Sequence, residues 1–146
     1  MNTPAPLLRP DRLVATFGRL LIAVLFLFGG YGFLAAPQAT IAEIHAAGLP
    51  FAQLGYGIAL FTEIGGAILL VVGYRTRLVG LGLALFTFIT GVIFHRNFED
   101  QNELINFVKN VAIAGGLLQL TAFGGGAWSW DAWRRIRRAR RARSPA

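Results

Sequence analysis

Three charged side chains, Arg19, Glu63 and Lys109, lie inside long apolar tracts of this sequence. A charge at the centre of a membrane-spanning helix costs about 2.5–3.5 kcal/mol on insertion scales, so such residues usually have a partner or a function. Glu63 is too short and too central to reach water, and it must be protonated or find a cation. We expect Lys109 to be that cation, with Arg19 as the alternative partner.

Three asparagine side chains lie near Lys109 in the sequence. Asn102, Asn106, Lys109 and Asn110 are spaced i, i+4, i+7 and i+8, which places them on one face of a helix. One interpretation is structural, because polar side chains hold membrane helices together at about 0.6 kcal/mol per hydrogen bond. The other is a ligand or proton site built from Arg19, Glu63, Asn106, Lys109 and Asn110. The spacing alone is compatible with both.

Four apolar tracts carry these residues, in a chain that is 55% hydrophobic and 14% charged, with a mean hydropathy of +0.55. A helix needs about 20 residues to cross the hydrocarbon core, and backbone groups in lipid must be paired internally. No tract shows the alternation of a β-barrel, and a soluble bundle would lack a polar surface. We therefore predict an all-α, polytopic membrane protein, one bundle of four transmembrane helices at about 13–35, 51–73, 78–94 and 104–123.

Most basic residues outside the tracts lie on one side. They occur before the first helix (Arg9, Arg12), between the second and third (Arg75, Arg77) and after the fourth, where seven Arg fall within 134–143. Arg96 in the opposite loop is outnumbered there by Glu99, Asp100 and Glu103. The positive-inside rule then puts both termini in the cytoplasm and loops 36–50 and 95–103 outside. The expected organisation is a cytoplasmic segment 1–12, a transmembrane domain 13–126 and a cytoplasmic tail 127–146. In the first outer loop, Thr40 and Glu43 form a capping-box pattern that predicts a short surface helix.

The tail is expected to contact lipid. Trp128, Trp130 and Trp133 precede the arginines, and Trp is a common anchor at the membrane interface. Clustered Arg beside it is attracted to anionic headgroups at about 1 kcal/mol per residue. Because the basic run directly follows a spanning helix, we favour lipid over nucleic acid as its partner.

The residue inventory excludes several chemistries. The chain has no cysteine, which removes thiol relays and cysteine-ligated iron–sulfur clusters. Its two histidines, His45 and His95, both map to the outer edge, which disfavours a haem inside the bundle. A solvated loop is a better interpretation of 95–103 than a metal site. We expect no metal and no cofactor bound by the chain alone.

The segments "GRLLIAVLFLFGGYGFL", "EIHAAGLP", "TEIGGAILLVVGYRTRLVGLGLALFTFITGVIFH" and "NELINFVKNVAIAGGLLQLTAFGGGAWSWD" together resemble the DoxX family of small four-helix membrane proteins. The resemblance covers about residues 17–131, and the Glu-Gly-Gly pattern near Glu63 and the "FVKNVAIAGGLL" run are its most specific parts. It implies a multi-pass protein of a bacterial-type inner membrane. By position, Arg19, Glu63, Lys109 and Asn110 match the family's recurrent polar residues.

Some members of that family are subunits of quinone-linked oxidoreductases or associate with redox and stress complexes, which suggests two functional hypotheses. In the first, the chain holds a quinone or a similar redox partner for a catalytic protein, with Glu63 taking up a proton and Lys109 or Asn110 bonding a carbonyl. In the second, it is a non-catalytic scaffold or chaperone-like subunit whose polar residues are structural. The first requires a cavity that reaches the polar residues, and the second requires a solid core. Both fit an accessory subunit better than an independent enzyme, and both allow a homo-oligomer.

Overall fold

The structure, a computed structural model, describes residues 10–142, so Arg9 and Arg143 of the predicted basic flanks lie outside the described residues. Four of its segments are long and apolar enough to cross a membrane, which confirms the predicted four-helix membrane fold. The elements are α1 (Pro10–Ala35), α2 (Pro37–Ala46), α3 (Ala52–Leu60), a π-helix η1 (Phe61–Gly65), α4 (Gly66–Val72), α5 (Thr76–Phe94), α6 (Gln101–Phe123) and α7 (Trp130–Ala142). The second span is the continuous run α3–η1–α4.

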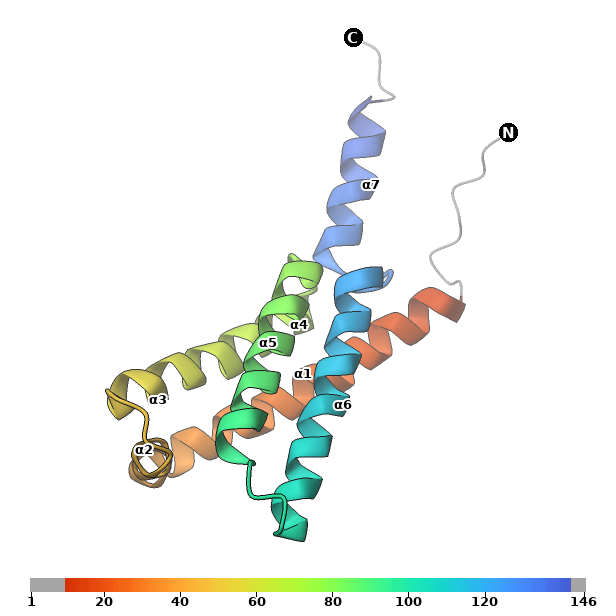
Figure 1. Cartoon of the computed structure of the whole chain (residues 1–146). Coiled ribbons are helices and arrows are strands. Elements are labelled where there is room, and N and C mark those ends of the chain that lie inside the picture. Colours follow the sequence, from red (N-terminus) through yellow and green to blue (C-terminus); the bar gives the residue numbers. More distant parts are fainter. Residues whose placement is uncertain (1–9, 143–146) are drawn as a thin grey trace.

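The spanning helices are not arranged as four parallel rods. In Figure 1, α5 and α6 run side by side, whereas α1 crosses them obliquely. α1 packs mainly on η1 and α4. The short α2 lies at one end of the bundle, and α7 extends from the opposite end, where α1 also begins. The start of α1 and the whole of α7 therefore share one end, as an even number of spans requires.

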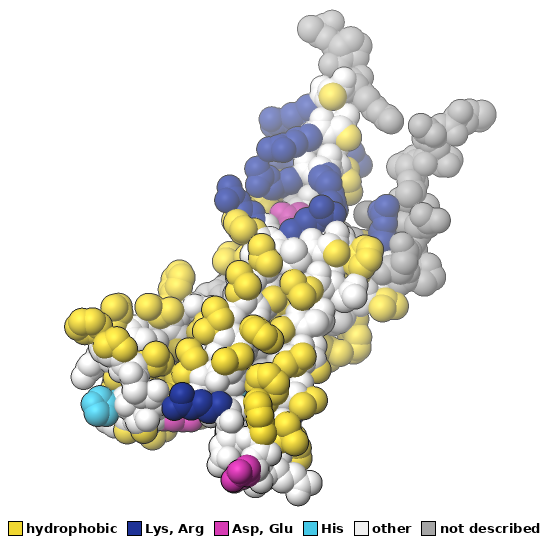
Figure 2. Space-filling view, in the orientation of Figure 1, with side chains coloured by type: hydrophobic (Ala, Val, Ile, Leu, Met, Phe, Trp, Pro, Cys, Tyr) yellow, Lys and Arg dark blue, Asp and Glu magenta, His cyan; other side chains and the backbone are white. Residues whose placement is uncertain are grey.

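The sides of the bundle are covered with large apolar side chains, as Figure 2 shows for one face. Exposed examples occur on all four spans: Phe17, Phe28, Phe61, Leu85 and Val108 are each about half exposed or more. Apolar surface on this scale is not stable in water and marks the face that contacts lipid.

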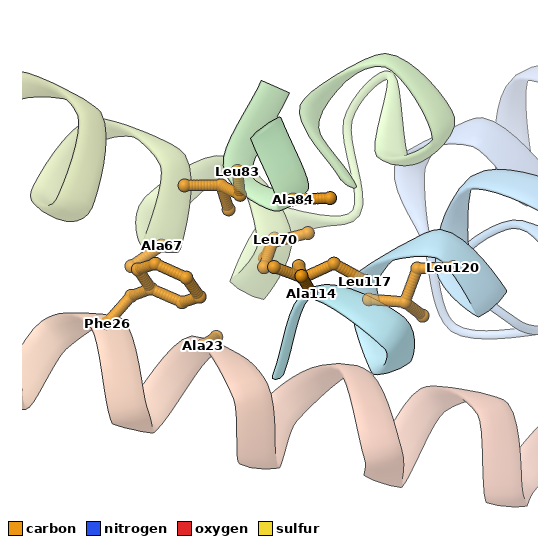
Figure 3. Packing of buried hydrophobic residues seen from close by; sticks show 9 residues of the cluster. All are labelled: Ala23, Phe26, Ala67, Leu70, Leu83, Ala84, Ala114, Leu117 and Leu120. Atoms are coloured by element: carbon orange, nitrogen blue, oxygen red, sulfur yellow. The ribbon is translucent and has the colours of Figure 1, made fainter. Parts of the chain in front are cut away.

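The core lies where the four spans meet, and small residues make the close approach feasible. Figure 3 shows Phe26 of α1 directed at Ala67 of α4, beside Ala23. On the other side, Gly80 of α5 is so close to α6 that a Cβ there would come within 3.1 Å of the carbonyl oxygen of Leu117. Packing of this kind, rather than hydrophobic burial, holds helices together in lipid.

The short helix predicted between the first two spans forms as α2, but its predicted capping box is wrong. α2 begins at Pro37 with Ala36 as an N-cap that makes no side-chain hydrogen bond. Thr40 lies inside the helix, where its hydroxyl donates to the carbonyl oxygen of Ala36 at 3.2 Å. Proline at the first helical position fixes a suitable φ and needs no amide partner, so the helix starts four residues earlier than the capping box predicts, with Ala36 rather than Thr40 as its N-cap. The buried face of α2 is anchored by Ile44.

At the opposite end, the segment after α6 turns back across the bundle. Hydrogen bonds of two side chains, Arg19 and Asp131, hold it there. The guanidinium of Arg19 in α1, which is 1% exposed, donates from Nη2 to the carbonyl oxygen of Trp128 at 2.7 Å. The carboxylate of Asp131 accepts from the backbone N–H groups of Arg75 (3.0 Å) and Thr76 (2.8 Å). We call these contacts the Arg19–Asp131 junction.

The junction satisfies groups that would otherwise be unpaired. The first turn of α5 has free N–H groups and a positive partial charge, and the Asp131 carboxylate matches both. The backbone N–H of Asp131 also donates to the carbonyl oxygen of Gly73 at 3.1 Å. Gly73 has a φ of +71° and contacts both Arg19 and Ser129, so no side chain fits there. α1, the α4–α5 turn and the start of α7 are thus tied at one point.

The first prediction concerns sidedness. Cysteines placed at Ala46 and Asn97, both exposed at the α2 end, should react with a membrane-impermeant thiol reagent added to intact cells. A cysteine at Ala139, exposed on α7, should react only after the membrane is opened. The absence of native cysteine removes background labelling. Labelling of the Ala139 variant in intact cells would reverse the predicted orientation.

The second prediction concerns the junction. Asp131→Asn keeps the size of the side chain but removes its charge and one of two acceptor oxygens. We expect it to cost about 1–3 kcal/mol, the usual range when a buried hydrogen-bonded group loses its partner, and to lower the melting temperature in mild detergent. Glu99→Gln, at an exposed position at the other end, is the matched control and should melt like the wild type. Equal melting of all three proteins would contradict a stabilising role for the junction.

Candidate functional site

A cavity of about 340 Å³ opens beneath α2 and extends into the bundle between α1, η1, α5 and α6. Most of its wall is apolar, with Phe33, Phe86 and Ile93 among the lining residues. Its polar residues lie at two levels: Thr40, Glu43 and His95 near the α2 end, and Glu63, Thr90 and Asn110 deeper in the bundle. An apolar pocket with a few polar groups that fix orientation is the usual form of a small-molecule site.

Glu63 reaches this cavity from the π-helix η1. A π-helix adds a residue to the helical turn, is rare, and occurs often at functional sites. The sequence predicted an uninterrupted span at 51–73, and nothing in the η1 sequence "FTEIG" by itself indicates the wider turn. The π turn changes which faces of the second span point inward on either side of Glu63.

Two glycines of α1 make room for Glu63 and its neighbour Ile64. Gly29 lies directly against the carboxylate, and a Cβ at Gly29 would overlap Oε2 of Glu63. A Cβ at Gly30 would come within 2.5 Å of Cγ1 of Ile64. The Glu63 Oε2 atom is buried and has no hydrogen-bond partner among the described residues. A buried polar atom without a partner is costly and calls for a bound proton, water or ligand.

Asn110 supplies an amide to the same cavity. Its side chain packs against Gly91 of α5, where an added Cβ would come within 3.0 Å of the Asn110 Cβ. The nearby Thr90 hydroxyl already donates to its own helix, at 2.9 Å to the Phe86 carbonyl oxygen. The Asn110 amide is therefore the deep group that can donate to a ligand, and the Glu63 carboxyl is the group that can exchange a proton.

One ion pair lies at the opening of the cavity near α2. His95 Nδ1 lies 2.9 Å from Oε2 of Glu103, and both side chains are partly exposed. Glu43 of α2 also lines the cavity. Within residues 10–142, no group of three or more His, Asp or Glu side chains is arranged to hold a metal ion.

The structure brings together only two of the five predicted site residues, Glu63 and Asn110. The expected ion pair with Glu63 is wrong for both candidate cations. Lys109 is exposed, and Arg19 lies in the junction at the other end of the bundle. The only ion pair among the described residues is the one at His95. Asn106 is half-buried but does not line the cavity.

The rotation of α6 explains why Asn110 lines the cavity and Lys109 does not. Ala114 and Leu117 are buried in the core, and Asn110 shares their face at i, i+4 and i+7. Consecutive residues of a helix point about 100° apart, so Lys109 is turned away from that face.

The sequence did not predict that α2 and Gly29 would contribute to the site. The one available signal was the glycine pair at 29–30, because adjacent glycines within an apolar helix often mark a close approach. Trp128, Trp130 and Trp133, the predicted lipid anchors, are all exposed.

Comparison with known proteins places this geometry in a family. Residues 14–96 match the DoxX family, a region that includes Gly29 and Glu63. The inner membrane protein YqjF of Escherichia coli strain K12 is 36% identical over 113 residues, covering 77% of this chain and 85% of the relative. The inner membrane protein YphA of the same strain is 32% identical over 118 residues, covering 77% of this chain and 84% of the relative. No solved structure matches the chain. With four spanning helices and this extent of similarity, the chain belongs to the DoxX family and is an integral, multi-pass protein of the inner membrane.

Proposed function

We propose that the protein binds a quinone, or a similar small neutral carbonyl compound, in the cavity beneath α2 and presents it to a catalytic redox partner. The observation that carries the proposal is the apolar cavity lined by Glu63, a residue whose buried Oε2 atom has no hydrogen-bond partner among the described residues. Asn110 lines the same cavity and provides a hydrogen-bond donor. A quinone alternates between a carbonyl form and a reduced, hydroxyl form. The amide can donate a hydrogen bond to the carbonyl, and the carboxyl can exchange a proton with the hydroxyl.

The charges of the lining argue against other ligand classes. Glu43 and Glu63 are the acidic side chains of the wall, and the lining contains neither Lys nor Arg. An anionic ligand would therefore face repulsion without compensation. The predominantly apolar wall favours a molecule that partitions into lipid, which is where a protein with this exposed apolar surface resides.

The two deep residues have distinct expected roles. The Asn110 amide donates a hydrogen bond to a carbonyl oxygen and orients the ligand. Glu63 donates a hydrogen bond when it is protonated and accepts a proton from a ligand hydroxyl when it is ionised. Electrons would pass to or from the partner protein, because no electron carrier can be assigned to this chain. This role is that of an accessory subunit.

The scaffold hypothesis makes a different demand on the structure. It treats the polar residues as contacts between helices, and such contacts need no space around them. Glu63 instead borders a cavity and has a buried oxygen without a hydrogen bond. This arrangement favours a binding role over a structural one.

The third prediction tests the space beside Glu63. Gly29→Ala places a methyl group where the carboxylate lies, so it should displace Glu63 and weaken quinone binding by about tenfold or more, the effect of losing one hydrogen bond to an ionisable group. Gly32→Ala is the matched control on the same helix, because a Cβ there meets nothing within 4 Å. Binding is measured by titrating the detergent-purified protein with a short-chain quinone. Equal affinities in the two variants would contradict the proposed position of the ligand.

The fourth prediction separates the two neighbouring residues of α6. Asn110→Leu keeps the volume but removes the donor, and we expect about tenfold weaker quinone binding. Lys109→Gln alters the adjacent exposed residue and should leave binding unchanged. Organic extraction and mass spectrometry of the wild-type protein should also recover a quinone. A protein that carries no extractable quinone and binds none on titration would favour the scaffold hypothesis instead.

A further inference from the structure

A second cavity, of about 440 Å³, lies at the opposite end of the molecule between the α4–α5 turn and α7. Five arginines line it: Arg75 from the turn, Arg77 from the first turn of α5, and Arg134, Arg135 and Arg138 from α7. We call this cavity the basic cleft. Residues more than 55 positions apart in the sequence therefore converge on one space, which neither the basic turn nor the basic tail would form alone.

The positive charges of the basic cleft are not neutralised within the described residues. Asp131 is the only acid in its wall, and both carboxylate oxygens already accept backbone N–H groups, from Arg75 and Thr76. No ion pair is formed there, since the only one between residues 10 and 142 joins His95 to Glu103. Asp131 brings the arginines together without pairing with their guanidinium groups.

Three of the six arginines of α7 line the basic cleft, and the other three do not. Arg134, Arg135 and Arg138 line the basic cleft, whereas Arg137 stacks on the ring of Trp133 at 4.5 Å. Arg141, one turn after Arg137, is also absent from the lining of the cleft. Figure 2 shows basic side chains gathered along α7 and over the adjoining end of the bundle.

The geometry points to a phosphate site: we propose that the basic cleft binds a phosphate-bearing anion, either the headgroup of an anionic phospholipid or a soluble phosphate compound. Guanidinium groups match phosphate oxygens with paired N–H donors, and several of them can surround one or two phosphates. The cleft also lies where lipid headgroups would be found, because the first turns of α5, including Leu78, line it. Basic pockets at the ends of spanning helices are suited to such headgroups.

The test compares two double variants that remove the same charge. Arg77→Gln with Arg138→Gln removes one charge from each wall of the basic cleft, and Arg137→Gln with Arg141→Gln removes two charges of α7 that do not line it. All four positions are exposed, so both proteins should fold alike. Each protein is purified in an uncharged, phosphate-free detergent at about 0.15 M salt, where diffuse surface attraction is largely screened. Binding of phosphatidylglycerol is followed by native mass spectrometry, and binding of inorganic pyrophosphate by the rise in melting temperature.

The wild-type protein should bind at least one probe saturably. The cleft variant should bind it on the order of 30-fold more weakly, because each Arg near an anionic group contributes about fivefold. The control variant should stay within about threefold of the wild type. Saturable binding of phosphatidylglycerol alone would identify a lipid headgroup as the ligand, and saturable binding of pyrophosphate would identify a soluble phosphate source. Equal weakening in both variants, or no saturable binding of either probe, would overturn the proposal.

Discussion

The structure depends on how a chain that is 55% hydrophobic satisfies the few polar groups within its spans. In lipid no water compensates an unpaired group, so each charge must reach an end of the bundle or find a partner. Arg19 meets this requirement at one end by donating to the Trp128 carbonyl oxygen. The Asp131 carboxylate accepts hydrogen bonds from backbone N–H groups at the start of α5. These two contacts fix the end of the bundle and the starting point of α7.

Glu63 neither reaches an end of the bundle nor has a partner within residues 10–142, and this exception identifies the candidate site. Its Oε2 atom has no partner among the described residues, although the surrounding helices are packed closely enough to need glycine at position 29. A π-helix and an unsatisfied carboxyl group both reduce stability relative to a regular apolar helix. Such costs are usually found where function requires them.

The two ends of the molecule are thereby specialised. The α2 end contains an apolar cavity whose wall has acids but neither Lys nor Arg, which suits a neutral ligand from the membrane. The opposite end contains the basic cleft, where five arginines face a single acid whose oxygens are already bonded. Because α7 is tied to the bundle through Asp131, occupancy of the basic cleft would bear directly on the same contacts that hold the helices together.

The sequence by itself determined the four spans, the short outer helix and the basic tail, because length and hydropathy dictate which segments enter a membrane. It also singled out Glu63 and Asn110 among the polar residues of the spans. Only the tertiary structure decided which of them meet. The spacing places Lys109 and Asn110 on one broad face of α6 but does not say which edge of that face points inward, so contacts with distant helices turn Asn110 inward and leave Lys109 exposed. The same contacts direct Arg19 to a backbone carbonyl of residue 128, a partner that no local pattern could indicate.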